Sequence, residues 1–464
     1  MLKNIVVIGS GLAGVLICNE LVQGVPNVTL LEAGPKDDII YPETDFLKKH
    51  FGVVKTFCYG GGGTTNLWHN GLIPLNFDDI HYQTFKTMLA DAKIYIDTAA
   101  NRLFFKSKSY RTEYETVRTE MNQLVEKLRV FPEGVDCLLY PKRFSRLTPD
   151  ARVSAYYNVS DTTFEHDQRN VTSIAFVTGG KKRSVAPDAV ILSAGTLGTP
   201  LLVKKVLLAA GRAIGNVGSG LADHPMGFIG KVKIKKDLNS IFKELSTSDR
   251  GDYISRTAVR LKSDCGQYTC CVFFRPALTM QNDLSIYKYK SKLGASSRSE
   301  RLKNAFSLKI LHPDILAEIY SHLFGVQLQS RIYNILVLFE QKRGNSKVQY
   351  YNSKRIGIDW SISNNELAIY NQMVLKLQTM LSKISDEIVV KVPLSEDWLW
   401  SAAHHSGTIS LGDKEDDLVD TNLKLKSSDN VFICDGSIIQ EHSYANTGLT
   451  IGQLALRLVD KLLK

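Results

Sequence analysis

Two apolar runs separated by a glycine-rich turn open this chain and restrict its fold more than any other feature. The first run, Ile5–Ile8, leads directly into Gly9-Ser10-Gly11-Leu12-Ala13-Gly14 and then into a stretch with helical character. The second run, Val28–Leu31, ends in Glu32-Ala33-Gly34. This order of strand, glycine turn, helix, strand and acid is the one that a dinucleotide-binding βαβ unit requires.

Within the turn, each glycine has a different physical task. Gly9 permits the tight turn, Gly11 lets the backbone approach a pyrophosphate, and Gly14 lets the helix and the strand pack closely. The helix N-terminus adds unpaired N–H groups and the positive end of its dipole. Glu32 lies 18 residues after Gly14, where a carboxylate can accept hydrogen bonds from ribose hydroxyls. Its charge disfavours a 2′-phosphate and so argues against NADP, whereas FAD and NAD both fit.

Two later stretches favour FAD over NAD. Cys58–Trp68 contains a second glycine-rich loop, Gly60-Gly61-Gly62-Gly63, which does not belong to a strand–helix phosphate motif. Near the C-terminus, Asn430–Ser437 has the pattern of a short buried strand that ends in Asp-Gly, and Asn446–Ile451 then opens a final amphipathic helix. An N-terminal glycine turn combined with a C-terminal strand, Asp and helix is the way in which large flavoproteins hold FAD.

With these pieces in place, the chain resembles the glucose–methanol–choline (GMC) oxidoreductases over nearly its whole length. The matching stretches are Gly9–Gly14, Leu31–Gly34, Gly61–Trp68, Val190–Thr196 with Thr199–Leu202, Asn216–Gly218 with Leu221–Pro225, His404–Thr408, Asp435 and Asn446–Ile451. The chain departs from the family pattern at Leu411, where Met is frequent, and at Thr447, where Pro is common. Some relatives bind flavin covalently through a His before the loop Trp, and this chain has Leu67 there, so the resemblance implies non-covalent FAD.

The resemblance also implies the organisation of the chain. We expect an α/β fold, in which a Rossmann-like FAD-binding domain of the GMC and p-hydroxybenzoate hydroxylase-like type is joined to a second, strand-rich α+β substrate domain. The FAD-binding domain would comprise residues 1–225 and 401–464, with a largely helical excursion at 76–150, and residues 226–400 would form the substrate-binding domain. The predicted elements outside the βαβ unit are a helix at Tyr114–Leu128 and strands at Phe228–Ile234, Tyr268–Phe274, Asn334–Phe339 and Val348–Tyr351.

The same resemblance assigns roles to individual residues. His404 matches the catalytic histidine of the family and would take the hydroxyl proton of an alcohol while a hydride passes to flavin N5; a neutral imidazole, with a pKa of about 6.5, suits this task near pH 7. Asn446 would hold the same hydroxyl. The residues expected to bind the cofactor are Gly9, Ser10, Gly11, Gly14, Glu32, Ala33, Gly34, Gly62, Gly63, Thr64, Asn66, Trp68, Val171, Ala194, Gly195, Asp435, Gly436, Asn446 and Thr447.

The other histidines near these motifs have plainer interpretations. His405 is expected to point away from the site on the same strand, because side chains alternate along a strand; the alternative is a supporting role directly behind the site. His224, in Asp223-His224-Pro225, is expected to be a structural hydrogen-bonding residue, and His442 is a candidate for the pocket wall. No role is assigned to His69, which follows the loop Trp.

Composition agrees with a soluble enzyme of 464 residues and 44% hydrophobic content, which favours two or three domains with large cores. The stretch nearest to a membrane span, Ala189–Val203, contains two glycines and a proline and is predicted to be a strand and a turn. Because the first strand begins almost at Met1, we expect no signal peptide and a cytoplasmic location. The seven cysteines are odd in number and widely spaced, so neither a disulfide framework nor a metal site is expected.

Positive charge is concentrated in the predicted second domain. Between Lys231 and Lys309 there are 17 Lys and Arg against 7 Asp and Glu, and this excess of +10 equals the net charge of the whole chain. A solvated basic face is the simplest interpretation. The functional alternatives are an acidic partner, an anionic membrane surface or an anionic substrate; nucleic acid is the least favoured, since no recognition motif accompanies the charge.

Taken together, the sequence predicts an FAD-dependent oxidoreductase that acts on the CH–OH group of a sugar or another polyfunctional alcohol. The electron acceptor, whether O₂, a quinone or a cytochrome, is left open. Two alternatives on the same fold are a flavin-containing lyase of the hydroxynitrile lyase type and a non-catalytic flavoprotein kept for binding or assembly.

Overall fold

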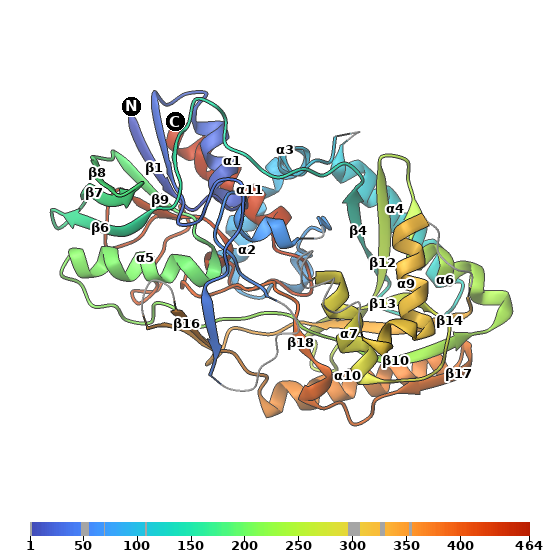
Figure 1. Cartoon of the computed structure of the whole chain (residues 1–464). Helices are drawn as coiled ribbons and strands as arrows, with labels where there is room; N and C mark the ends of the chain where they lie inside the picture. Colours follow the sequence, from blue (N-terminus) through green and yellow to red (C-terminus); the bar gives the residue numbers. More distant parts are fainter. Residues whose placement is uncertain are drawn as a thin grey trace.

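The protein is described from a computed structural model that covers residues 2–47, 55–68, 70–106, 109–295, 307–324, 330–351 and 355–464. Figure 1 shows a parallel sheet with its helices at one end of the molecule and a larger antiparallel sheet at the other. His69 and part of the basic stretch, residues 296–306, lie outside the described residues.

The parallel sheet is built around the N-terminal apolar run. Its strands are β1 (Asn4–Ile8), β2 (Asn27–Leu31), β5 (Ser154–Tyr156), β9 (Ala189–Leu192) and β19 (Val431–Ile433), in the order β19-β9-β1-β2-β5. All of these pairings are parallel. Parallel sheets are covered on both faces, so their strands are apolar throughout, and every residue of β9 is buried. The central strand β1 therefore brings together segments that are far apart in the sequence.

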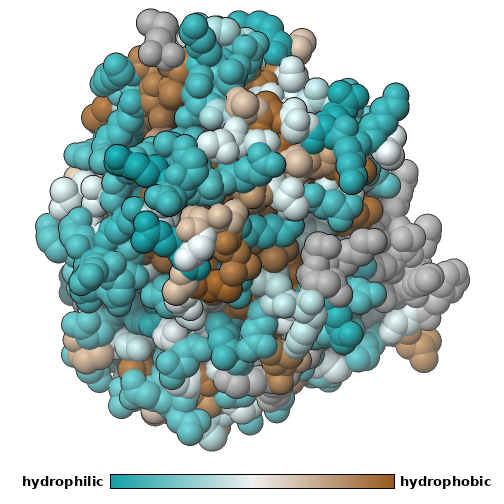
Figure 2. Space-filling model, turned by 90° about the vertical axis from the view of Figure 1, so that its left-hand side faces the viewer, coloured by the Kyte–Doolittle hydropathy of each residue, from teal (hydrophilic) through white to brown (hydrophobic). Residues whose placement is uncertain are grey.

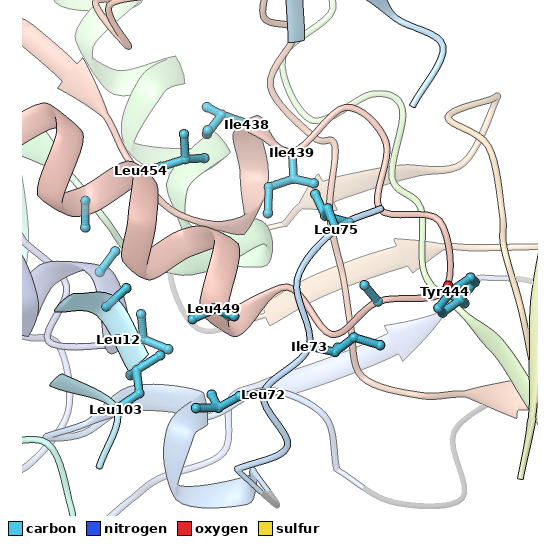
Figure 3. Close-up of a cluster of buried hydrophobic side chains, with 14 of the residues drawn as sticks. Leu12, Leu72, Ile73, Leu75, Leu103, Ile438, Ile439, Tyr444, Leu449 and Leu454 are labelled. Carbon is cyan, nitrogen blue, oxygen red and sulfur yellow. The ribbon is translucent and has the colours of Figure 1, made fainter. Parts of the chain in front are cut away.

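Helices cover this sheet and fix the position of the first turn. The helix α1 (Leu12–Leu21) packs against α11 (Gly448–Leu463), and α11 packs in turn against α3 (Ile96–Arg102). Figure 3 shows Leu449 and Leu454 of α11 among the buried side chains of this region, which include Leu12 and Leu103. The C-terminal helix thus completes the domain that the N-terminal strand begins.

A small antiparallel sheet and one long helix complete this end of the molecule. The strands β6 (Ser160–His166), β7 (Val171–Thr178) and β8 (Lys181–Val185) form the sheet, and α5 (Gly195–Ala209) packs against β6. The β7–β8 hairpin turns at Gly179 and Gly180, which both have positive φ, as short hairpin turns require. After this hairpin the chain continues directly into β9 of the parallel sheet.

The second sheet contains, among the described residues, the order β11-β12-β13-β14-β10-β17, with β18 paired to β10 and β4 paired to β12. The bounds are β4 (Val135–Pro141), β10 (Pro225–Ile234), β11 (Ser248–Asp249), β12 (Tyr253–Lys262), β13 (Thr269–Ala277), β14 (Ile332–Phe339), β17 (Ser385–Val390) and β18 (Trp400–Ser401). The helix α10 (Asn364–Ser382) packs against β17 and begins with a capping box between Ser363 and Glu366. A strand-rich second region is thus present where the sequence predicts it.

The remaining described elements connect these sheets. The helices are α2 (Gln83–Ala92), α4 (Tyr110–Glu126), α6 (Asn239–Ser246), α7 (Leu284–Ala295) and α9 (Pro313–Phe324). Short 3-10 turns lie at Gly63–Leu67, Phe77–Asp79, Lys93–Tyr95, Lys236–Leu238, Leu308–Leu311, Glu396–Trp398 and Gly436–Ile438. A third small sheet joins β3 (Glu43–Phe46) to β15 (Lys347–Tyr350) and β16 (Arg355–Asp359).

Two of these elements cross the domain boundaries that the sequence predicts. The strand β4 lies in the excursion at 76–150 but pairs along its whole length with β12 of the second sheet. The strand β16 lies in the range 226–400 but pairs in parallel with β3 near the N-terminus. Such pairings between distant segments leave no local signal in the sequence, because apolar periodicity reports a buried face and not a partner.

The face of the molecule that carries the parallel sheet is mostly hydrophilic. Figure 2 views the end that carries the parallel sheet and shows hydrophobic groups in small separate patches among hydrophilic ones. Among the described residues, none of the helices combines the length and the apolar character needed to cross a membrane.

Candidate active site

A cavity of about 1690 Å³ lies between the two sheets and is lined by residues of both. On one side are the carboxyl ends of β1 and β2, including Ile8 and Leu31, where α/β sheets bind their ligands. On the other side are residues of β10, β13 and β14, among them Phe228, Phe273 and Leu336. The cavity is large enough to hold a dinucleotide and a small substrate together.

The first glycine turn forms one wall of this cavity and has room for a ligand. A Cβ atom added to Gly9 would lie 2.4 Å from the Ser193 carbonyl oxygen, and one added to Gly14 would lie 1.9 Å from the Gly9 carbonyl oxygen. Neighbouring backbone therefore leaves no space for a side chain at either position. A Cβ atom on Gly11 would meet no atom within 4 Å. Gly11 lines the cavity at the start of α1, so its open side is a cradle where a phosphate can approach the backbone.

Glu32 ties the two glycine-rich loops together. Its Oε2 atom accepts hydrogen bonds from the backbone N–H and the hydroxyl of Ser10, at 2.8 and 2.7 Å. Its Oε1 atom accepts hydrogen bonds from the backbone N–H groups of Gly34 and Gly60, at 2.8 and 2.9 Å. The Ser10 hydroxyl also lies 3.1 Å from the Gly60 carbonyl oxygen and could donate to it instead. Glu32 Oε2 would then be able to accept a hydrogen bond from a ribose hydroxyl. This structural task of Glu32 is not evident from the motif.

The second glycine loop packs against the first. The Gly62 N–H donates to the Ser10 carbonyl oxygen at 3.0 Å, and a Cβ atom on Gly63 would lie 3.0 Å from Gly11 Cα. Both Gly62 and Gly63 have positive φ, which a side chain would oppose. The side-chain amide of Asn66 holds the loop by donating to the carbonyl oxygens of Gly61 and Gly63. Thr64 and Trp68 then face the cavity.

The C-terminal segment supplies the third wall. Asp435 accepts hydrogen bonds from the N–H of Gly195, the hydroxyl of Thr199 and the N–H of Ser437, and burial raises its pKa. Gly436, Ala194 and Gly195 line the cavity beside it. The first turn of α11 points into the same space, since Asn446, Thr447 and Gly448 are all lining residues. The positive end of the α11 dipole therefore faces the cavity.

Some predicted cofactor residues lie behind this wall. Gly14, Gly34, Gly62 and Asn66 are outside the lining and support the loops through close packing and hydrogen bonds. Val171 is also outside the lining. It is fully buried in β7, and the side chain of Asn430 hydrogen-bonds both its N–H and its carbonyl oxygen. Ala33 and the other predicted cofactor residues line the cavity.

Both His404 and His405 line the cavity, although strand alternation predicts that His405 points away. The segments 222–225 and 401–406 pair through Ala222 with Ser406 and through Pro225 with Ser401, but between these pairs the chain bulges. Ala403 has a φ of 64°, which breaks the extended conformation that alternation requires. The local backbone is therefore not a regular strand, so alternation does not determine where the His405 side chain points.

Asp223 holds this bulge in place. Its Oδ1 atom accepts the backbone N–H groups of His224 and His404, at 2.7 and 2.9 Å. Its Oδ2 atom accepts the Ser401 hydroxyl and lies 3.0 Å from His405 Nδ1. Complete burial acts to raise the pKa of Asp223, but the nearby His405 ring and the Ser401 hydrogen bond outweigh burial and hold the pKa well below its usual range.

Side chains outside the predicted catalytic and cofactor residues also support the site. Thr56 lines the cavity and its hydroxyl lies 3.0 Å from His405 Nε2. His224, predicted as structural, lies with its Nδ1 atom 2.9 Å from His404 Nδ1. His442, predicted as a candidate for the pocket wall, is buried behind it with 1% exposure. The Asp-His-Pro motif marks His224 in the sequence, but only the fold shows that its ring reaches His404.

Asn446 completes the set of predicted catalytic residues. Its side chain lines the cavity, and its amide donates to the Gly71 carbonyl oxygen at 3.3 Å. His404 and Asn446 thus reach one cavity from different segments. No group of three or more His, Cys, Asp or Glu within the described parts of the chain is arranged to hold a metal ion.

Comparisons with known proteins agree with this geometry. Residues 345–455, which include His404 and Asn446, match the family model described as GMC oxidoreductase. The resemblance to the GMC oxidoreductases is confirmed. The fold class is confirmed as well, and the family match supports an oxidoreductase that uses FAD. No match was found among curated proteins.

Solved structures share this fold across the chain. A pyridoxine 4-oxidase from Mesorbium loti has a TM-score of 0.64 and 14% identity, with 99% of each chain covered. A formate oxidase has a TM-score of 0.59 and 14% identity, with 100% of this chain and 99% of the other covered. An FAD-dependent oxidoreductase from Chaetomium thermophilum has a TM-score of 0.59 and 13% identity, with 99% of each covered. At these identities the likeness is one of fold.

The position of Asp223 generates a testable prediction about stability. The substitution Asp223→Ala leaves buried donors unpaired and should lower the free energy of unfolding by roughly 3–5 kcal/mol. Since the folded pKa of Asp223 is depressed, this contribution is present above the unfolded pKa of about 3.9 and is lost as pH falls through the folded pKa. The measurement is the thermal unfolding midpoint at neutral pH. Ser401→Ala, which removes one donor, is the control and should have a much smaller effect; equal midpoints for Asp223→Ala and wild type would contradict the prediction.

Proposed function

We propose that this protein is an FAD-dependent oxidoreductase that oxidises a CH–OH group of a small-molecule substrate, with His404 as the base. The observation that carries the proposal is the meeting, in one cavity, of the open Gly11 cradle, the α11 N-terminus and the pair His404 and Asn446. Bound FAD would supply the two-electron acceptor, so that an alcohol loses a hydride to FAD and a proton to His404 and becomes a carbonyl compound.

The residues that would hold the cofactor come from three segments. Ser10 and Gly11 would face the pyrophosphate, and Glu32 the ribose. Thr64 and Trp68 would border the flavin from the second loop, with Ala194, Gly195, Asp435 and Gly436 opposite. Thr447 and the first N–H groups of α11 would place positive potential where negative charge grows on reduction.

A non-covalent cofactor is favoured by the chemistry of the nearest thiol. Cys58 lines the cavity, but burial raises its pKa to about 12 and its Sγ atom donates to the Gly63 carbonyl oxygen at 3.3 Å. A neutral thiol is a weak nucleophile. With Leu67 in place of a histidine, neither residue provides an attachment point.

FAD retention is the first test. Acid precipitation should release all of the FAD, and flavin that stays with the precipitated chain would show a covalent bond. The substitution Gly11→Val should abolish FAD retention because its side chain fills the cradle, whereas the fold has room for it. The measurement is the ratio of flavin to protein absorbance after gel filtration. Gly344→Val is the control, since a Cβ atom there meets only one atom, at 3.9 Å.

The identity of the base is the second test. His404→Ala should slow flavin reduction by the substrate roughly 10²–10⁴-fold and leave FAD bound. His405→Ala should cost much less, because the His405 ring is directed to Thr56 and Asp223. Asn446→Ala should slow reduction and weaken substrate affinity more than His404→Ala does. Anaerobic stopped-flow bleaching of the flavin by candidate alcohols measures all three; a larger effect of His405→Ala would reverse the assignment.

The same bleaching experiment separates the alternatives. A lyase of the hydroxynitrile lyase type would convert its substrate while the flavin stays oxidised, and a non-catalytic flavoprotein would do neither. Electron acceptors such as O₂, quinones and cytochromes can then be compared by the rate at which they reoxidise the bleached protein.

The substrate end of the cavity favours an anionic substrate. Arg256 of β12, Arg275 of β13 and Lys290 of α7 line it, and Lys290 lies 5.4 Å from the centre of the Phe228 ring. The acidic lining residues, Glu32, Glu43, Asp161 and Asp435, come from the FAD side, and within the described part of residues 226–400 the lining contains none. A carboxylate or phosphate group on the substrate would therefore be attracted to this end.

This preference is testable by charge removal. Arg275→Gln or Lys290→Gln should lower the second-order rate of flavin reduction roughly 10–100-fold, because a hydrogen bond to a charged group contributes about 1.5–3 kcal/mol. The effect should weaken as salt rises. Lys236→Gln removes an equal charge from an exposed position outside the cavity and should change the rate little. Equal effects of all three variants would mean that the charge acts at long range and not in the cavity.

A further inference from the structure

A pair of facing histidines lies behind the cavity wall. His404 lines the cavity, and its Nδ1 atom is 2.9 Å from Nδ1 of His224, which is fully buried and outside the lining. On the other side of the His224 ring, Nε2 lies 2.8 Å from the carbonyl oxygen of Ser443. The two rings meet nearly edge to face, with an interplanar angle of 81°.

The positions of the protons follow from these contacts. A carbonyl oxygen only accepts hydrogen bonds, so Nε2 of His224 must carry a proton. A neutral imidazole carries one proton, so Nδ1 of His224 is bare and accepts a hydrogen bond. The donor is Nδ1–H of His404, and the lone pair of neutral His404 is then on Nε2.

The opposite arrangement would require a charged His224. If His404 Nδ1 were the acceptor, His224 would have to carry protons on both nitrogens. Burial lowers the pKa of His224 well below its usual range, and the His442 and His404 rings add to this effect. Asp223, its neighbour in the chain, directs Oδ1 to the His224 backbone N–H. The neutral form of His224 is therefore favoured.

We infer that His224 is a positioning residue that fixes the tautomer of His404, so that Nε2 of His404 is the basic nitrogen. This inference rests on the proposed function, in which His404 is the base. The Nε2–H tautomer is the usual one for a histidine in water, so the site has to impose the other. The acceptor at His224, held by the Ser443 carbonyl, provides this.

Backbone contacts between the two segments fix the position of the His224 ring relative to the His404 ring. The Ala402 N–H donates to the His224 carbonyl oxygen at 3.1 Å, and Pro225 pairs with Ser401 at the start of β10. On the far side, the His442 ring lies over His224, with ring centres 4.1 Å apart and an interplanar angle of 37°. Neither ring nitrogen of His442 has a hydrogen-bond partner among the described residues, and burial lowers its pKa to about 3. His442 thus fills the space behind His224 with a neutral ring.

The direct test is the tautomer of His404 in the oxidised holoenzyme. Protein labelled with ¹⁵N and ¹³C histidine is examined by NMR, and the His404 signals are identified by their loss in His404→Gln. We expect the ¹⁵N shift of Nδ1 to be that of a protonated nitrogen and the shift of Nε2 to be that of a bare one. The reverse pattern would overturn the inference. This readout does not need a substrate, so it tests the tautomer even if no alcohol reduces the flavin and the proposed function fails.

Two substitutions of His224 separate positioning from structural support. His224→Asn places an amide oxygen near the former Nδ1 position, where it can accept the His404 proton, whereas His224→Leu fills similar space without an acceptor. We expect His224→Leu to slow flavin reduction roughly 10²–10⁴-fold and His224→Asn to recover most of that loss. In the NMR spectrum, His404 should keep its tautomer in His224→Asn and lose it in His224→Leu. Equal rates for the two variants, with the His404 tautomer unchanged in both, would show that His224 only fills space.

Discussion

Buried carboxylates hold the loops of this protein in place, and the cavity depends on them. The loops that line the cavity have few strand or helix hydrogen bonds of their own, and unpaired donors would be costly in the interior. Glu32 accepts hydrogen bonds from both glycine loops. Asp435 accepts them from the segments that follow β9 and β19. Asp223 accepts them from the two segments that carry His224 and His404. Each carboxylate thus joins stretches of chain that are far apart in the sequence.

A fourth carboxylate extends this pattern to the antiparallel sheet. Asp79 is buried, forms an ion pair with Arg260 of β12 at 3.0 Å and accepts the Ser443 hydroxyl at 3.1 Å. The Thr269 hydroxyl of β13 lies 2.8 Å from the Ser443 hydroxyl. Because the Ser443 carbonyl oxygen faces His224, the second sheet reaches the histidine pair through a chain of short polar contacts. The two ends of the molecule are therefore connected electrostatically as well as by packing.

The sequence predicts the parts of this structure that depend on local chemistry. The βαβ unit follows from the apolar runs and from Gly9, Gly11 and Gly14, whose separate tasks are visible in the contacts that a Cβ atom would make. The predictions are less successful where distant segments meet. The pairing of β4 with β12 and the hydrogen bonds between Asn430 and the Val171 backbone depend on tertiary contacts. The position of His405 depends on the positive φ of Ala403. A pattern of side chains indicates which face is buried and gives no information about the partner.

His404 and His405 are neighbours with the same side chain, and their different contacts give them different roles. His405 faces Asp223 with Nδ1 and Thr56 with Nε2, so both of its ring nitrogens are directed at protein groups. His404 faces a neutral ring through Nδ1. If Nε2 takes a proton from a substrate, the Nδ1–H bond to His224 persists unchanged, because the same proton stays on the same nitrogen. No group behind the base has to move during proton uptake, and a site that needs no rearrangement at that moment is preorganised in the sense that makes electrostatic catalysis effective.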